Sequence, residues 1–319
     1  MIRSFRLPLF LLLLALAMPG RAEAESGCPP AAAQPTSEQV QAARRVARDH
    51  GFLWRISKDG RSSFLYGTIH VAKLDWLMPG PVVMQALAAS DTIALELDLL
   101  DPQIRAAMAR GVAALPKVTL PEPLASRIRR QGESECLAGA EFDTLPAEMQ
   151  VMTLTMIAGR RDGIDPAYGT DVVLAAAGHA AGKSVVSLET PEAQLAVLHA
   201  GDAAETEAFV AGTLDDLEAG RARRMIGRLA AGWAASDYEG MAGYADWCEC
   251  LNSDAERATM KRVLDDRNPG LAERIDGLHA GGKRVFAAVG SLHLFGPLGL
   301  PALMAQRGYR VERVDLARF

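Results

Sequence analysis

Two short segments of this chain end in the same pattern, Gly-x-x-His, and lie near opposite ends of the sequence. The apolar runs Phe64–Tyr66 and Val285–Val289 each predict a buried strand. A glycine follows each run, and His70 and His293 stand three residues after that glycine, where a sharp turn displays them at the carboxyl end of the strand. Because open α/β sheets bind ligands at these ends, we expect both histidines in one site.

A carboxylate is the third candidate for this site. Glu96 lies within the apolar run 93–97, and a carboxylate in an apolar strand is costly to bury unless it is paired or bound to a metal ion. If this strand is parallel to the one before His70, Glu96 reaches the same edge of the sheet. The alternative is an alternating strand that turns Glu96 and Asp98 toward solvent.

Two imidazoles and one carboxylate are a common ligand set for divalent transition metals, which supply Lewis acidity and an activated water. We therefore expect His70 and His293 to bind a metal ion, with Glu96 as a ligand or general base. The His-Glu-x-x-His motif, the Gly-x-Ser-x-Gly elbow and glycine-rich phosphate loops are absent from the sequence. Metal-free hydrolysis with a histidine as the base is the alternative.

Four further residues are candidates for supporting roles. Tyr168 and Asp171 form a polar cluster, and Asp171 either caps the following helix, fixes a histidine tautomer or accepts a substrate amine. Arg267 stands at a helix boundary, where it either binds a carboxylate or is a surface cation. Glu189 follows a predicted strand and either joins the site or adds charge to the first turn of the next helix. We expect the remaining histidines to be structural, namely His50, His179, His199 and His279.

Strand and helix signals alternate along the chain and predict an α/β fold, with a mostly parallel or mixed central sheet flanked by helices. A hairpin with an Asp59-Gly60 turn opens it, and further strands are expected over 91–97, 183–188, 283–289 and 309–314.

The apolar spacing from residue 202 to 265 is helical and predicts a helical cap on the sheet. No low-complexity linker interrupts residues 25–319, which are expected to form a single domain. The formal net charge of −5 and the pI near 5.8 argue against nucleic acid as a partner. Beyond the N-terminal segment no apolar stretch reaches the length of a membrane span.

Residues 1–24 have the pattern of a secretory signal peptide. Two arginines precede an apolar run over 7–18, and a small-x-small cleavage pattern ends at Ala24. We therefore expect the mature protein to be periplasmic or secreted. Cys28 lies close to the cleavage site, but the carboxylate of Glu25 argues against lipid anchoring at this cysteine.

An even number of cysteines in an exported chain favours disulfides. Cys248 and Cys250 are separated by one residue, and side chains two positions apart rarely point together. We therefore expect each of them to pair with one of the distant cysteines, Cys28 and Cys136, in either combination. A Cys-x-Cys metal site is the alternative, although no nearby histidine or second such pair completes it.

Short motifs stand in a fixed order between about residues 50 and 315. They are Leu65–Val71, Leu95–Asp98, Tyr168–Asp171, Gly182–Val185, Leu188–Thr190, Arg267–Asn268 and Val289–Gly296. The ordered set resembles the TraB/PrgY/GumN family, which includes the Tiki metalloproteases. The resemblance implies an α/β fold similar to that of the erythromycin esterases and ChaN.

In the Tiki branch the resemblance also implies a peptidase that depends on Mn²⁺ or Co²⁺ and trims a secreted protein near its N-terminus; Zn²⁺ is the alternative ion. It carries a metal or catalytic role onto His70, Glu96 and His293 only. The expected absence of a C-terminal membrane anchor and the different helical stretch keep the substrate from being carried over. Our leading hypothesis is an exported metal-dependent peptidase with a peptide or protein substrate. A protein that binds a peptide or a haem-like ligand without turnover is a further alternative.

Overall fold

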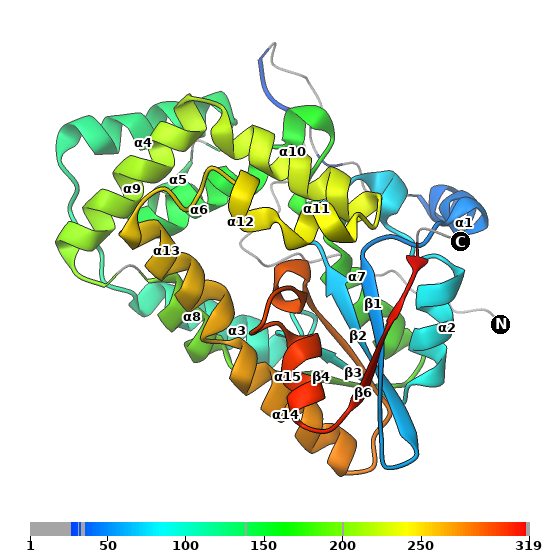
Figure 1. Cartoon of the computed structure of the whole chain (residues 1–319). Helices are drawn as coiled ribbons and strands as arrows, with labels where there is room; N and C mark the ends of the chain where they lie inside the picture. Colours follow the sequence, from blue (N-terminus) through cyan, green and yellow to red (C-terminus); the bar gives the residue numbers. More distant parts are fainter. Residues whose placement is uncertain (1–26, 31, 33–35, 138, 200, 317–319) are drawn as a thin grey trace.

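The centre of the molecule is a six-stranded sheet with the strand order β4-β3-β5-β2-β1-β6 (Figure 1). The computed structural model describes residues 27–30, 32, 36–137, 139–199 and 201–316. The predicted signal peptide therefore lies outside the described residues. The strands are β1 Phe52–Lys58, β2 Arg61–Thr68, β3 Thr92–Leu95, β4 Ser184–Ser187, β5 Val285–Gly290 and β6 Arg310–Val314.

Four neighbouring strands, β4, β3, β5 and β2, run parallel, whereas β1 pairs antiparallel with both β2 and β6. This mixed sheet confirms the predicted α/β class. The hairpin between β1 and β2 turns at Asp59 and Gly60, with φ of 52° and 73°. Two successive positive φ values belong to a type I′ turn, which matches the twist of the flanking strands and explains why Asp-Gly stands here.

Helices cover both faces of the sheet because the crossovers run in opposite directions. The chain moves from β2 to β3 to β4 toward one edge, then from β5 to β6 toward the other. Right-handed crossovers therefore place α2 and α7 on one face, and α14 and α15 on the other (Figure 1). These helices are α2 Pro81–Ala89, α7 Thr170–Ala180, α14 Asn268–Ala280 and α15 Leu300–Gln306. With both faces covered, the residues 285–289 of β5 are fully buried.

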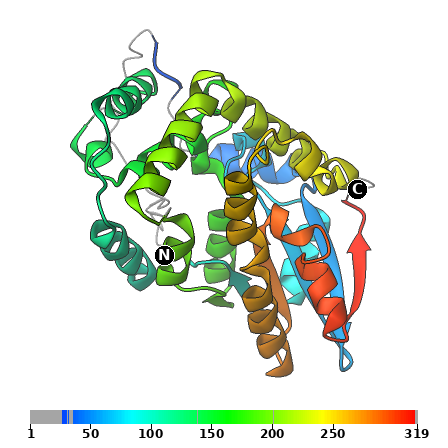
Figure 2. The ribbon, with the colours of Figure 1, turned by 60° about the vertical axis from the view of Figure 1, so that its left-hand side comes forward.

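A second group of helices packs into its own apolar core beside the sheet (Figure 2). Helices from both halves of the chain contribute to it, with Ile128 from α4, Leu154 from α6 and Leu214 from α9 among the buried residues. Of the cap predicted over 202–265, α9 therefore packs together with helices that precede β4. The helices of this second group are α3 Pro102–Ala114, α4 Glu122–Ser134, α5 Ala140–Asp143, α6 Ala147–Ile157, α8 Pro191–Leu198 and α9 Ala203–Glu218.

Further elements complete the described chain. They are α1 Ser37–Val46, η1 Leu74–Trp76, η2 Arg160–Asp162, η3 Pro166–Tyr168, α10 Arg221–Ala234, α11 Tyr238–Ala242, α12 Tyr244–Trp247, α13 Asp254–Met260, the π-helical turn η4 Lys261–Asp265 and η5 Ser291–Leu294. Among the helices of the described residues, none is both long enough and apolar enough to cross a membrane.

The expected disulfide pairing is wrong. Cys28 bonds Cys136, and Cys248 bonds Cys250. Side chains two positions apart diverge on an ordinary backbone, but Glu249, the second residue after α12, takes a left-handed φ of 53°. This turn brings the two Cα atoms within 5.0 Å, so both sulfur atoms lie on the same side of the chain.

Candidate active site at the carboxyl ends of the parallel strands

Each of the four parallel strands delivers one polar side chain at its carboxyl end. His70 follows β2, Glu96 follows β3, Glu189 follows β4, and His293 follows β5. Because β5 lies between β2 and β3, the strand that carries Glu96 is next to the strand that carries His293, not next to the strand that carries His70. The two Gly-x-x-His segments are themselves neighbours, with Gly67 in register with Val289. One edge of the sheet thus gathers all four residues.

His70 is held by a carboxylate from the first turn of α7. Its Nδ1 donates a hydrogen bond to Asp171 Oδ2 at 2.9 Å, while Thr68 Oγ1 donates to the other oxygen at 2.6 Å. The negative charge of Asp171 raises the pKa of His70 to about 9. The His70 side chain is 43 % exposed, so its Nε2 is left for a ligand or substrate. Asp171 lies within α7, and the residue at the cap position is Gly169.

His293 is held in the opposite electrostatic state. Its Nδ1 donates to Asn268 Oδ1 at 2.7 Å, and its Nε2 accepts from Arg267 Nη1 at 3.2 Å. Burial lowers its pKa to about 4, so the ring is neutral at pH 7. The site therefore contains one protonated and one neutral imidazole before any ligand binds.

Arg267 joins the two carboxylates of the site. Its guanidinium binds Glu189 with two hydrogen bonds, of 2.9 Å from Nε and 2.5 Å from Nη2, and also donates to Glu96. Burial opposes the ionisation of Glu96, but the two imidazoles and this guanidinium outweigh it and lower the pKa of Glu96 to about 2. Arg267 is only 12 % exposed, so the interpretation as a surface cation does not hold.

Three of these side chains converge on Gly290. A Cβ atom at this position would lie 3.3 Å from Glu96 Oε1, 3.3 Å from His70 Nε2 and 3.7 Å from His293 Cδ2. The Gly290 N–H also donates to Glu96 Oε1 at 2.7 Å. The missing side chain of Gly290 keeps a small space open between the three groups, and the backbone amide fixes the carboxylate at its edge.

The donor atoms suit a metal ion in kind, since each imidazole is fixed through Nδ1 and presents Nε2. Their arrangement is nevertheless that of a hydrogen-bonded cluster. Within the described part of the chain, no three His, Cys, Asp or Glu side chains are positioned so that they could hold an ion as they stand. Arg267 instead bonds both Glu96 and His293.

The structure also shows where the other residues discussed from the sequence lie. Glu96 and Asp98 are 8 % and 4 % exposed, so the solvent-facing alternative for this segment is wrong. Tyr168 is buried in η3, beside Gly169, whose Cβ would lie 2.7 Å from the His70 carbonyl oxygen. The remaining histidines bond distant partners, namely His50 with the Ala234 carbonyl, His179 with Asp98, His199 with Glu148 and His279 with Ser63.

Three residues of the cluster were not predicted from the sequence to have a role. Asn268 holds His293, Thr68 holds Asp171, and Gln194 donates to Glu189 at 3.1 Å and to Glu96 at 3.4 Å. Asn268 directly follows Arg267 and was part of the same short motif, which was a usable signal. Gln194 lies on α8 among unremarkable helical residues, so nothing local distinguishes it.

The sequence of the chain that carries this cluster matches a known protein family. The sequence profile of the TraB/PrgY/gumN family matches residues 52–313, from the first strand to the last. The chain belongs to the TraB/PrgY/gumN family. No curated protein and no solved structure matches it significantly. The family match covers all four strand-end residues together with Arg267 and Asp171, so the cluster lies inside the matched region.

Proposed function

We propose that this member of the TraB/PrgY/gumN family is an exported metal-dependent hydrolase that acts on a peptide or secreted protein. The observation that supports it best is the convergence of His70, Glu96 and His293 on the space above Gly290. His70 Nε2, His293 Nε2 and the Glu96 carboxylate would hold a divalent ion, with Mn²⁺ or Co²⁺ favoured and Zn²⁺ as the alternative. The ion would supply Lewis acidity and lower the pKa of water.

The chain's own groups have defined tasks in this proposal. Asp171 and Asn268 orient the two imidazoles through their Nδ1 atoms, so that both Nε2 atoms face the site. Glu96 stays ionised at neutral pH and accepts a proton or contributes a ligand oxygen. His293 Nε2 could not hold an ion and accept from Arg267 at once, and the two bonds to Glu189 would keep the guanidinium at the edge of the site.

Export is part of the proposal and rests on two features. The first 24 residues carry the signal-peptide pattern, and Cys28 is bonded to Cys136. Such a bond forms and persists in oxidising compartments such as the periplasm or the extracellular space.

Metal content tests the proposal without a known substrate. The purified protein and the variants His70→Ala and His293→Ala are dialysed against Mn²⁺ or Co²⁺ and measured by elemental analysis. We expect one equivalent in the wild type and loss of the ion in both variants. His199→Ala is the matched control, because this histidine bonds Glu148 on α6. Unchanged metal content in His70→Ala would contradict the proposal.

A metal-free reaction is the second candidate, and the His70–Asp171 pair favours it. A carboxylate behind an exposed imidazole is the arrangement of a general base and its orienting group, and because the pKa of His70 is about 9 this base would be active at alkaline pH. In that case Arg267 stays bound to Glu96 throughout the reaction. Hydrolysis of a peptide library before and after EDTA treatment separates the two candidates, since only the metal-free reaction survives the chelator.

A further inference from the structure

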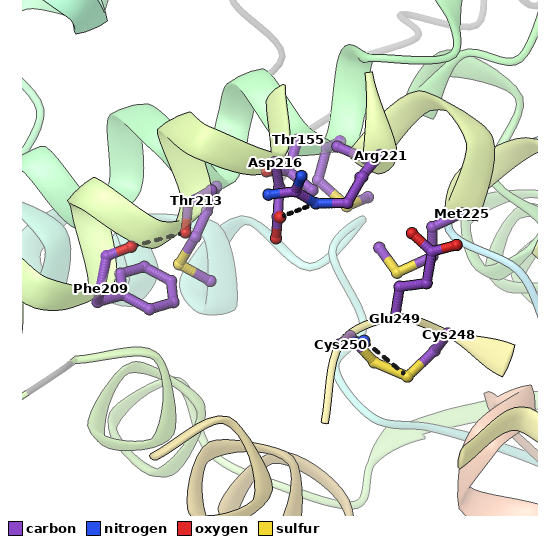
Figure 3. A pocket seen from close by; sticks show the side chains of 12 residues that line it. Thr155, Phe209, Thr213, Asp216, Arg221, Met225, Cys248, Glu249 and Cys250 are labelled. Atoms are coloured by element: carbon purple, nitrogen blue, oxygen red, sulfur yellow. Dashed lines mark hydrogen bonds and ion pairs between the residues drawn. A yellow bond between two sulfur atoms is a disulfide. The ribbon is translucent and has the colours of Figure 1, made fainter. Parts of the chain in front are cut away.

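A cavity of about 260 Å³ lies within the helical part of the molecule, built from elements that do not form the candidate active site. Figure 3 shows its lining side chains, which come from α6, α9, α10 and the segment after α12. Cys248, Glu249 and Cys250 form one wall, so the Cys248–Cys250 disulfide faces the cavity.

The Cys248–Cys250 bond does little to hold the fold together. Stabilisation by a disulfide grows with the length of the loop that it closes, and this loop contains one intervening residue. The Cys28–Cys136 bond closes a loop between residues 108 positions apart and is the structural disulfide of the chain. Stabilisation of the fold therefore does not explain why Cys248 and Cys250 form a disulfide.

The two sulfur atoms differ in access. Both residues line the cavity, but Cys250 is half-buried, whereas Cys248 is buried at 5 % exposure. An incoming thiolate therefore reaches Cys250 Sγ first, and Cys248 is the sulfur that leaves.

Each sulfur atom also has a hydrogen-bond donor in place. The Cys250 N–H lies 3.2 Å from Cys248 Sγ, and the Tyr244 hydroxyl lies 3.3 Å from Cys250 Sγ. A disulfide sulfur carries no hydrogen, so the hydroxyl is the donor in the second contact, which is shorter than its contact of 3.8 Å with Met225 Sδ. Burial raises the pKa of Tyr244 to about 12, and the hydroxyl keeps its proton at neutral pH. Both donors become stronger partners once a thiolate forms, because hydrogen bonds to charged groups are the stronger ones.

We propose that Cys248–Cys250 is a thiol–disulfide exchange site for a cysteine-containing polypeptide. A substrate thiolate attacks Cys250 Sγ, the Cys248–Cys250 bond breaks, and its electron pair leaves on Cys248 Sγ. A second thiolate of the same polypeptide then attacks the substrate sulfur of the mixed disulfide and releases Cys250 Sγ. The substrate dithiol is oxidised by two electrons, and the cysteine pair is reduced by the same two.

The cavity indicates the kind of polypeptide. Met152, Met156, Phe209 and Met225 supply thioether and aromatic surface, which adapts to apolar side chains of varied shape. Among the charged lining residues, Asp216 and Arg221 bond each other at 2.6 Å, and Glu249 is a further carboxylate. The lining therefore offers no unpaired cation to an acidic segment. A cysteine flanked by apolar residues therefore suits this cavity better than one flanked by acidic residues.

The first test compares the two disulfides within one molecule. The folded, oxidised protein is equilibrated in buffers of reduced and oxidised glutathione at pH 7, then acid-quenched, alkylated and mapped by mass spectrometry. We expect Cys248 and Cys250 to be reduced at glutathione ratios that leave Cys28–Cys136 intact, through a mixed disulfide on Cys250. Reduction of both pairs together, or of Cys248–Cys250 only after denaturation, would overturn the proposal.

Variants test the assigned roles. Cys248→Ser leaves the accessible sulfur and should form a mixed disulfide with oxidised glutathione at least about tenfold faster than Cys250→Ser, which leaves the buried one. Tyr244→Phe should shift the equilibrium about tenfold toward the disulfide, the size expected for one hydrogen bond to a charged sulfur. Tyr309→Phe is the control, since its hydroxyl bonds Asp276. Faster reaction of Cys250→Ser, or equal shifts in the two tyrosine variants, would contradict the assignment.

A pair of dithiol peptides tests the cavity. One peptide carries leucines beside its cysteines and the other carries glutamates, and both are mixed with the oxidised protein at equal thiolate concentration. We expect the leucine peptide to be oxidised at least about tenfold faster. Equal rates would exclude the cavity as the binding site of the polypeptide.

Discussion

His70 and His293 stand in the same local sequence pattern, but their neighbours in the fold give them opposite protonation states at neutral pH. The negative charge of Asp171, beside His70, raises the pKa of His70 to about 9. Burial beside Arg267 lowers the pKa of His293 to about 4. The difference comes from residues far away in the sequence, since Asp171 is on α7 and Arg267 precedes α14. The identity of a residue therefore does not set its role in this cluster; its partners do.

Replacing the partner should change the protonation of His70. In metal-free protein, Asp171→Asn removes the charge that raises the pKa of His70, so this pKa should fall from about 9 by at least about one unit. The imidazole resonances measured by NMR across a pH titration report it. Asp98→Asn is the matched control, because Asp98 bonds His179 instead. An unchanged His70 pKa in Asp171→Asn would contradict the electrostatic account.

His293 should make the metal-free protein sensitive to mild acid. Its pKa is about 4 when folded and about 6.5 when unfolded, so the unfolded chain binds more protons between these values. The stability that the neutral ring contributes is complete above pH 6.5 and is lost as the pH falls toward 4. Between pH 7 and pH 5 this loss amounts to about 2 kcal/mol.

Urea unfolding of the wild type and His293→Gln at pH 7 and pH 5, in the presence of EDTA, checks this loss. The wild type should lose about 2 kcal/mol more than the variant over this interval. His70 titrates in both proteins, so the difference between them isolates His293. Equal losses in the two proteins would show that the buried ring does not control acid stability.

At the scale of elements, the site depends on how closely helix α7 packs on the sheet, because α7 carries Asp171 toward His70. Gly178 permits this approach: a Cβ there would lie 2.5 Å from Ile93 Cδ1 and 2.9 Å from Val185 Cγ2. The strand ends set the other positions, since β5 lies between β2 and β3 and brings His293 between His70 and Glu96.

Gly178→Ala should therefore destabilise the protein by about 1–3 kcal/mol through overpacking against β3 and β4. Gly277→Ala in α14 is the matched control, because nothing lies within 4 Å of its Cβ. That variant should be neutral or up to about 1 kcal/mol more stable, since alanine favours the helix. Thermal unfolding measures the stability of both variants. A Gly178→Ala protein as stable as the Gly277→Ala protein would contradict close packing of α7 on the sheet at Gly178.

At the scale of the whole molecule, a sheet with its helices and a separate helical core are joined in one chain. Cys28–Cys136 fixes the chain around residue 28 to the segment after α4 and so to the helical core. The chain-entropy relation gives this bond about 4.7 kcal/mol of stabilisation, against about 1.5 kcal/mol for Cys248–Cys250.

Removing each pair by serine substitution should reproduce this order. Cys28→Ser with Cys136→Ser should lower the free energy of unfolding about three times as much as Cys248→Ser with Cys250→Ser. Guanidinium unfolding of the two double variants at pH 7 measures both. Equal losses would mean that the short bond is structural, and this would also weigh against its role in exchange.

The sequence by itself determined the features that depend on neighbouring residues. Alternating apolar runs predict the strands, Asp59-Gly60 predicts the hairpin turn, and the Gly-x-x-His pattern predicts histidines at strand ends, because each rests on local backbone preference and periodicity. The ordered motifs likewise indicated the family. These parts of the fold and of the candidate site could therefore be predicted from the sequence alone.

Only the tertiary structure decided what depends on contacts across the chain. It placed β5 between β2 and β3, joined Arg267 to Glu96 and Glu189, and closed Cys248–Cys250 through a left-handed Glu249. Strand order, the pairing of buried charges and an unusual backbone angle follow from the packing of distant segments, which no local pattern encodes.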